Sequence, residues 1–283
     1  MKTVCSHIGY YAHQVLERSK GALVSGVASR GIYLQPEDDW TLYLSLEKYR
    51  GPLTINLGGH FSWRENIKTG HPVHFISGKI RFPMDNVSIS YEDADIWRSA
   101  LNDGNREFIF KQMDSVLNLS KKLAAGNPYL SLLFENPVPI PDVPGLTEKI
   151  LNLRTALKDG DLERITSGST KLLGLGPGLT PLGDDFILGV LLTFNYCGIS
   201  NLKGHNLKKI NQIIIQHARE KTTRLSSSLL VCASEGAADE RLLIILDGIC
   251  SGNEITEGAL RDLLAWGSSS GIAVLAGMMA VLT

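Results

Sequence analysis

A glycine-rich run ahead of two aspartates is the part of this sequence whose residue types best suit chemistry. Residues 172–186 read LLGLGPGLTPLGDDF. Gly176 and Gly178 lack a Cβ, so a ligand can come close to the main chain there. Thr180 suits a helix N-cap and Pro181 the first helical position. We therefore expect a helix whose open N–H groups bind phosphate or carboxylate, or else a loop that merely caps a helix well.

The adjacent carboxyl groups of Asp184 and Asp185 conflict with a bound anion. In the first turn of a helix they complement the dipole but repel an anion, by about 1 kcal/mol or more if water is excluded. Either a cation or an arginine bridges carboxylate and anion, or the aspartates accept hydrogen bonds from an NH₂ group of the ligand. Neighbours on a helix point about 100° apart, so we expect one aspartate to face the ligand and the other to pair elsewhere.

Two later segments are also rich in hydroxyl groups. Residues 221–228 read KTTRLSSS inside what looks like one long helix, residues 207–233. Arg224 with nearby hydroxyls could clamp a carboxylate or phosphate, or the small residues could serve close packing or end one helix and cap the next. Residues 267–272 read GSSSGI and open an apolar helix, where a serine can act as N-cap.

A shared pocket is the hypothesis that joins these three segments, because together they supply helix N-termini, an arginine and two carboxylates. The expected catalytic residues are Asp184, Asp185 and Arg224. The expected substrate-binding residues are Gly176, Gly178, Thr180, Gly183, Thr222, Thr223, Ser226, Ser269, Ser270 and Gly271. We expect no metal site and no resident cofactor, with Mg²⁺ as an alternative.

The elements that must position these residues change type along the chain. Alternating and β-branched residues separated by turns predict strands at residues 22–27, 40–46, 53–57, 73–76 and 87–90. Helical spacing predicts one or two amphipathic helices within residues 93–125. Beyond residue 145 we predict helices at 146–158, 161–172, 181–196, 207–233, 238–249, 256–266 and 270–282.

The fold class we expect is α+β. The N-terminal half is β-rich, as an antiparallel sheet or partial barrel, and the C-terminal half is mainly helical. Residues 136–145 hold four prolines and cannot be helical, so they are the best candidate for a linker. The expected domains are residues 1–135, β-rich with one or two helices, the linker 136–145, and the helical domain 146–283 that carries the glycine-rich site.

Composition narrows the classes of function. The net charge is −1, and the 28 Lys and Arg residues form no basic block, so nucleic-acid binding is not expected. The uncharged stretches at residues 186–202 and 263–283 fall short of the roughly twenty continuous apolar residues of a membrane span. With four scattered cysteines, expected to be reduced core residues, and no signal-peptide pattern, we expect a soluble cytoplasmic protein.

At residues 176–186, GPGLTPLGDDF, the sequence resembles the small-subunit family of bacterial oxamate carbamoyltransferase, from anaerobic allantoin and purine breakdown. Residues 222–226 and 269–271 match the other two motifs of that family, and residues 21–57 resemble its N-terminal sheet. Ser268 is a departure, because relatives often have histidine there. If that histidine transfers a proton, the step is altered in this protein.

The resemblance implies transfer of a carbamoyl group between phosphate and the amide nitrogen of oxamate, together with two other subunits. Arg224, the helix N-termini and the two aspartates would then serve the phosphate, the carbonyl oxygen and the NH₂ group of carbamoyl phosphate. The alternative is a non-catalytic subunit or a binding protein for a small anionic metabolite. The two uncharged helices also predict a contact with partner subunits or a homo-oligomer.

Overall fold

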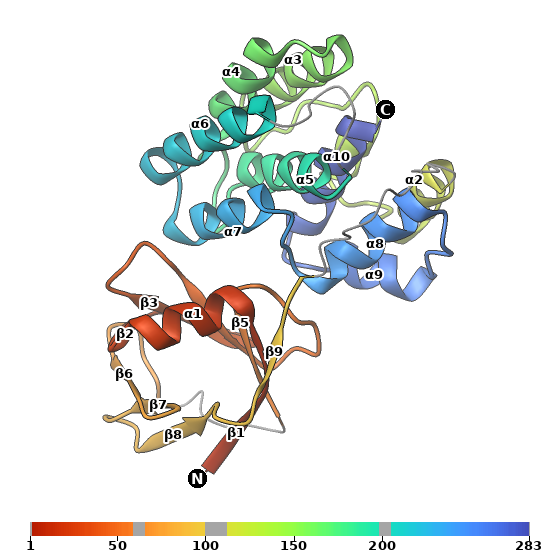
Figure 1. The fold of residues 1–283 in the computed structure, drawn as a ribbon. Coiled ribbons are helices and arrows are strands. Elements are labelled where there is room, and N and C mark those ends of the chain that lie inside the picture. The colour runs from red at the N-terminus through yellow and green to blue at the C-terminus, as the bar shows by residue number, and fades with distance from the viewer. Residues whose placement is uncertain (1, 59–65, 100–111, 198–204, 283) are drawn as a thin grey trace. The chain divides into compact units, whose positions relative to one another are not determined.

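The computed structural model describes residues 2–58, 66–99, 112–197 and 205–282, and the α+β fold class is confirmed (Figure 1). Contacts divide the chain into two compact units. The first is Met1–Ala100 with Ala238–Glu240, and the second is Leu101–Ala237 with Arg241–Thr283. The proline-rich residues 136–145 lie within the second unit. The domain boundaries set out above stay a prediction about independent folding, which limited proteolysis would test.

The first unit is a mixed sheet with one helix. Its described strands are β1 (Lys2–Gly9), β2 (Gly21–Ala28), β3 (Gly31–Pro36), β4 (Leu42–Ser45), β5 (Thr54–Leu57), β6 (Pro72–Ile76), β7 (Lys79–Phe82), β8 (Val87–Ser90) and β9 (Asp95–Trp97). The helix α1 spans Tyr10–Arg18. The strand order is β5-β4-β3-β2-β6-β7-β8-β1-β9, and an additional pairing joins β5 to β1.

The β5–β1 pairing closes the sheet into a barrel, with β9 added beside β1. Strand β1 can do this because its first residues pair with β8 while its later residues pair with β5 and β9. The pairings β1–β8, β1–β9 and β4–β5 are parallel, which differs from a purely antiparallel sheet. Alternating sequence shows which side chains are buried, but it does not show the direction of the neighbouring strand.

Period-two burial is clearest on the hairpin of β6 and β7. Val73, Phe75, Ile80 and Phe82 are buried, whereas the residues between them are half-buried or exposed. The two-residue turn between the strands has positive φ at Ser77 and Gly78, as hairpin turns that match the twist of the strands require. The apolar side chains of this sheet form the core of the first unit.

The second unit is helical among its described residues. Its elements are α2 (Met113–Leu123), the 3₁₀ helix η2 (Leu130–Leu133), α3 (Leu146–Asp159), α4 (Leu162–Leu172), α5 (Leu182–Cys197), α6 (His205–Lys221), α7 (Arg224–Ser234), α8 (Glu240–Ser251), α9 (Glu257–Leu264) and α10 (Ser270–Leu282). Helix α4 begins after the N-cap Asp161, whose side chain accepts a hydrogen bond from the Arg164 N–H. Caps of this kind use the unpaired N–H groups of a first turn.

Helices α5 and α10 form the core of this unit, with the other helices around them (Figure 1). A Cβ on Gly189 would lie 2.1 Å from the Val274 carbonyl oxygen, and one on Gly277 would lie 2.0 Å from the Phe186 carbonyl oxygen. The two backbones therefore touch where these glycines face them. Ten of the thirteen residues of α10 are buried, so both uncharged helices complete their packing inside this chain. The expectation that a subunit contact must cover them is wrong.

Other expectations from the sequence need correction. The predicted helix at residues 207–233 is two helices, because Thr223 is extended and caps α7. Strands β1, β3, β7 and β9 were not predicted, and β9 falls inside the stretch expected to be helical. Parts of the predicted 93–125 and 186–202 segments lie outside the described residues. No helix in the described ranges is long and apolar enough to cross a membrane.

Candidate active site

The glycine-rich loop enters α5 with its backbone N–H groups already bonded. The Gly183 N–H donates to the Leu175 carbonyl at 2.9 Å. The Asp184 and Asp185 N–H groups both donate to the Pro181 carbonyl, at 2.9 and 3.1 Å. Helix α5 therefore begins at Leu182, one residue later than expected, and Thr180 does not cap it. The expectation of open N–H groups for an anion is not met by these three residues.

Asp184 fastens the start of the loop to the segment before α7. Its Oδ1 accepts a hydrogen bond from the Gly174 N–H at 2.7 Å, and its Oδ2 accepts one from the Thr222 hydroxyl. Both carboxyl oxygens are thus used by the protein itself, and the residue is only 2% exposed. Asp184 is the aspartate that pairs elsewhere, and it positions the loop.

Thr223 makes a second link between the loop and α7. Its hydroxyl accepts a hydrogen bond from the Ser226 N–H at 3.1 Å, which caps the helix. The same hydroxyl donates to the Leu179 carbonyl at 2.6 Å. Of the two functions left open for residues 221–228, the ending of one helix and the capping of the next is therefore realised, and it also holds the loop in place.

Asp185 connects the loop to the start of α10. The hydroxyls of Thr180 and Ser270 are hydrogen-bonded to each other at 3.1 Å, and both lie within reach of the Asp185 carboxyl group, whose pKa they lower. The residue is 2% exposed, whereas Thr180 and Ser270 are half-buried. The two adjacent aspartates therefore hold two different segments, and all three sequence motifs meet at the start of α5.

One oxygen of Asp185 is left without such support. Its Oδ2 is buried and has no hydrogen-bond partner among the described residues. The hydroxyl bonds from Thr180 and Ser270 must therefore reach the other oxygen, Oδ1. Leaving a buried polar atom without a partner costs about 1–3 kcal/mol, and for a carboxylate oxygen protonation reduces that cost.

Burial raises the pKa of both carboxyl groups. For Asp185 the pKa rises to about 8, because desolvation and the negative charge of Asp184 outweigh the hydrogen bonds from Ser270 and Thr180. For Asp184 desolvation also raises the pKa, while Thr222, the Gly174 N–H and the nearby Ser226 hydroxyl lower it. The Ser226 hydroxyl lies close to Asp184 without forming a well-aligned bond. Near neutral pH, Asp185 is thus mainly the neutral acid.

Packing explains three of the glycines expected to bind substrate. Gly176 has a φ of +117°, and a Cβ there would lie 2.8 Å from the Leu182 nitrogen. A Cβ on Gly183 would lie 2.1 Å from the Leu172 carbonyl oxygen, and one on Gly271 would lie 1.8 Å from that of Leu263. Gly178 faces open space instead. Ligand contacts of these glycines stay a prediction.

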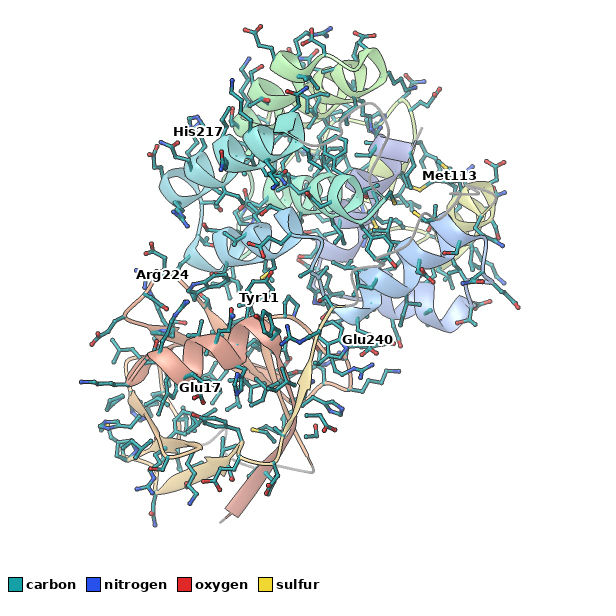
Figure 2. All side chains as sticks on the ribbon, in the orientation of Figure 1. Tyr11, Glu17, Met113, His217, Arg224 and Glu240 are labelled. Carbon is teal, nitrogen blue, oxygen red and sulfur yellow. The ribbon has the colours of Figure 1, made fainter. Side chains whose placement is uncertain are left out.

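The remaining candidates lie at helix starts. Arg224 is the first residue of α7 and its side chain is exposed; Figure 2 labels it at that end of the helix. The Ser269 carbonyl accepts the Ala273 N–H at 3.0 Å, so Ser269 occupies the N-cap position of α10. Ser226 is buried in the first turn of α7, and its hydroxyl lies near the Asp184 carboxyl group.

Two contributors were missed by sequence reasoning, namely the Gly174 N–H and the Leu175 carbonyl. Both act through the backbone, so side-chain type carries no signal for them, although a glycine-rich loop is where such contacts are common. Within the described parts of the chain, no group of three or more His, Cys, Asp or Glu side chains could hold a metal ion. All four cysteines are buried and none forms a disulfide.

Comparison with known proteins finds a family match in the part of the chain that contains this site. Residues 172–282 match the family described as oxamate carbamoyltransferase subunit AllH. The match runs from the last residue of α4 to the last residue of α10, so it includes all three converging segments. No solved structure matches the chain. Through this helical region the chain is similar to the family of oxamate carbamoyltransferase subunit AllH.

Proposed function

We propose that the chain is a working subunit of a carbamoyltransferase of the oxamate carbamoyltransferase type, and that its helical unit holds the reactants. The observation that carries the proposal is the meeting of three motifs at the start of α5, where the buried acid Asp185 lies, within the region that matches the family. Buried titratable groups with a shifted pKa are concentrated at functional sites. A loop that only caps a helix would not need such a group.

The reaction makes few demands on covalent chemistry. A bond forms between the carbamoyl carbon and the amide nitrogen of oxamate, the carbon–oxygen bond to phosphate breaks, and the nitrogen loses a proton. In this proposal the protein contributes positioning and electrostatic stabilisation, without a covalent nucleophile or a resident cofactor. Treatment with EDTA should therefore leave oxamate binding to the chain unchanged, as measured by calorimetry.

The residues divide this work between them. Because the N–H groups of Gly183, Asp184 and Asp185 are bonded within the protein, we assign the anionic phosphate to Arg224. We assign the NH₂-bearing group to Asp185 with Thr180 and Ser270, since carboxyl and hydroxyl oxygens accept N–H bonds. Asp184 acts by positioning the loop. Partner subunits, which the family description implies, would complete the reaction.

The test is reconstitution of the chain with its partner subunits. We expect phosphate release from carbamoyl phosphate that depends on oxamate, and at least a tenfold loss of kcat/KM in Arg224→Ala and Asp185→Leu. Asp142→Asn, at an exposed position outside the site, is the matched control. Full turnover in both site variants would instead favour the alternative, a non-catalytic subunit that binds a small anionic metabolite.

A further inference from the structure

The hydrogen-bonding pattern at Asp185 has a polarity that can be worked out atom by atom. Oδ1 accepts from the Thr180 and Ser270 hydroxyls, because Oδ2 has no partner among the described residues. Each of these hydroxyls has one proton and uses it within the cluster, on Asp185 or on the other hydroxyl, so its oxygen keeps a lone pair for a neighbouring donor. The two hydroxyl oxygens are therefore acceptors, 3.1 Å apart and half-buried.

The charges around Asp185 in the described part of the chain do not favour its ionised form. The charged group that acts on it is Asp184, and its effect is repulsive. The elements packed against α5 are α4, α7 and α10, and α10 has no titratable residue. The titratable residues on the other two are Glu163, Arg164 and Lys171 of α4, which are exposed or half-buried, and Arg224 and Cys232 of α7, the first exposed and the second buried.

A neutral Asp185 carries its proton on Oδ2, since Oδ1 is the oxygen that faces the hydroxyl donors. The cluster then presents one donor, the Oδ2–H, next to two acceptors, the hydroxyl oxygens of Thr180 and Ser270. A primary amide has the complementary set: a carbonyl oxygen that accepts and an adjacent NH₂ group that donates twice. A carboxylate of the same shape has no proton to donate and brings a second negative charge beside Asp184.

We propose that Asp185, with the hydroxyls of Thr180 and Ser270, is the specificity-determining cluster that recognises the primary amide group of a reactant. The inference rests on the proposed function and adds to it the group recognised and the residues that recognise it. The amide oxygen accepts from Oδ2–H, and the NH₂ group donates to the hydroxyl oxygens. Sites that hydrogen-bond a ligand group reject analogues lacking it far more strongly than apolar pockets do.

The test compares matched ligands on the full chain with its partner subunits. Oxamate has an amide group where oxalate has a second carboxylate. Carbamoyl phosphate has an NH₂ group where acetyl phosphate has a methyl group. At about pH 6.5 we expect calorimetry to show that, in one of the two pairs, the ligand with the amide group binds at least tenfold more tightly than its analogue. That pair identifies the reactant whose amide group the cluster recognises. The preference should decline as the pH rises past about 8, where Oδ2 loses its proton.

Variants separate recognition from a merely structural function. An asparagine side chain keeps one acceptor and one donor without titrating, so Asp185→Asn should keep the amide preference and extend it above pH 8. Asp185→Leu and Ser270→Ala should each reduce the amide preference at least fivefold. Ser167→Ala, at an exposed position on α4, is the control. Circular dichroism checks that each variant is folded.

The outcomes distinguish this inference from the proposed function. Equal affinity for amide and analogue in both pairs would overturn amide recognition while leaving the carbamoyltransferase proposal intact. Absence of binding by all four ligands to the folded complex would overturn both. Loss of the amide preference in Asp185→Asn, with the fold retained, would also refute the neutral-acid mechanism. Asparagine is uncharged like the neutral acid, so such a loss would mean that binding requires the ionised carboxylate.

Discussion

Replacing Asp185 by asparagine should change the dependence of stability on pH in a direction that the burial of this residue dictates. The pKa of Asp185 is about 8 in the folded chain against an ordinary value of 3.8. A raised pKa means that folding favours the protonated form. The stabilising contribution is therefore complete below about pH 4 and is lost progressively as the pH rises to about 8. Asparagine does not titrate, so the Asp185→Asn variant escapes this loss.

The size of the effect follows from the proton difference between the folded and unfolded states. One proton corresponds to about 1.4 kcal/mol per pH unit, so the free energy of unfolding of wild type should fall by up to about 4 kcal/mol relative to Asp185→Asn between about pH 5 and pH 8.

Urea unfolding of both proteins at about pH 5, 6.5 and 8 measures the difference directly. Asp142→Asn, which removes an exposed carboxyl group, controls for the general effect of charge. A free-energy difference between wild type and Asp185→Asn that stays constant over this range would show that Asp185 is ionised and solvated in the folded protein. The argument for a neutral acid at the start of α5 would then fail.

Three further predictions concern the framework of the site. Gly183→Ala should destabilise the chain by about 2 kcal/mol or more in urea unfolding, because the new Cβ would lie 2.1 Å from a carbonyl oxygen of α4. Gly258→Ala, also at the second position of a helix, should not destabilise it, because a Cβ there would make only an ordinary contact, 4.0 Å from the Thr256 hydroxyl oxygen. Thr223→Ala should cost about 1–2 kcal/mol through loss of the α7 cap, and Thr223→Ser, which keeps the hydroxyl, should cost little. The Cys197 and Cys250 sulfur atoms lie 2.7 Å apart, so diamide should join them into a disulfide, detected as a linked peptide by mass spectrometry and absent in Cys197→Ala.

The sequence predicted the fold class well because burial patterns are local. Period-two alternation located β2, β4, β5, β6 and β8, and helical spacing located the helices of the second unit. Closure of the barrel could not be predicted from the sequence, since it depends on β1 pairing with three strands that are distant in sequence. The break between α6 and α7 was ambiguous because threonine and serine suit both a helix cap and a tightly packed helix.

At the candidate site, too, side-chain types could be read from the sequence, whereas backbone geometry could not. Residue type and spacing brought Thr180, Thr222 and Ser270 into one hypothesis, and hydrogen bonds between their segments join them in the structure. The expected anion cradle did not follow, because the N–H groups at the start of α5 bond to carbonyls of the loop itself.

That closed terminus changes what the two neighbouring aspartates do. An open helix N-terminus would stabilise negative charge on Asp185, through free N–H donors and the dipole. With the N–H groups of residues 183–185 already bonded, burial is the largest effect on the carboxyl group, and its pKa rises. The same loop whose carbonyls accept these N–H groups thereby leaves a neutral acid at the start of α5, which is suited to an uncharged amide.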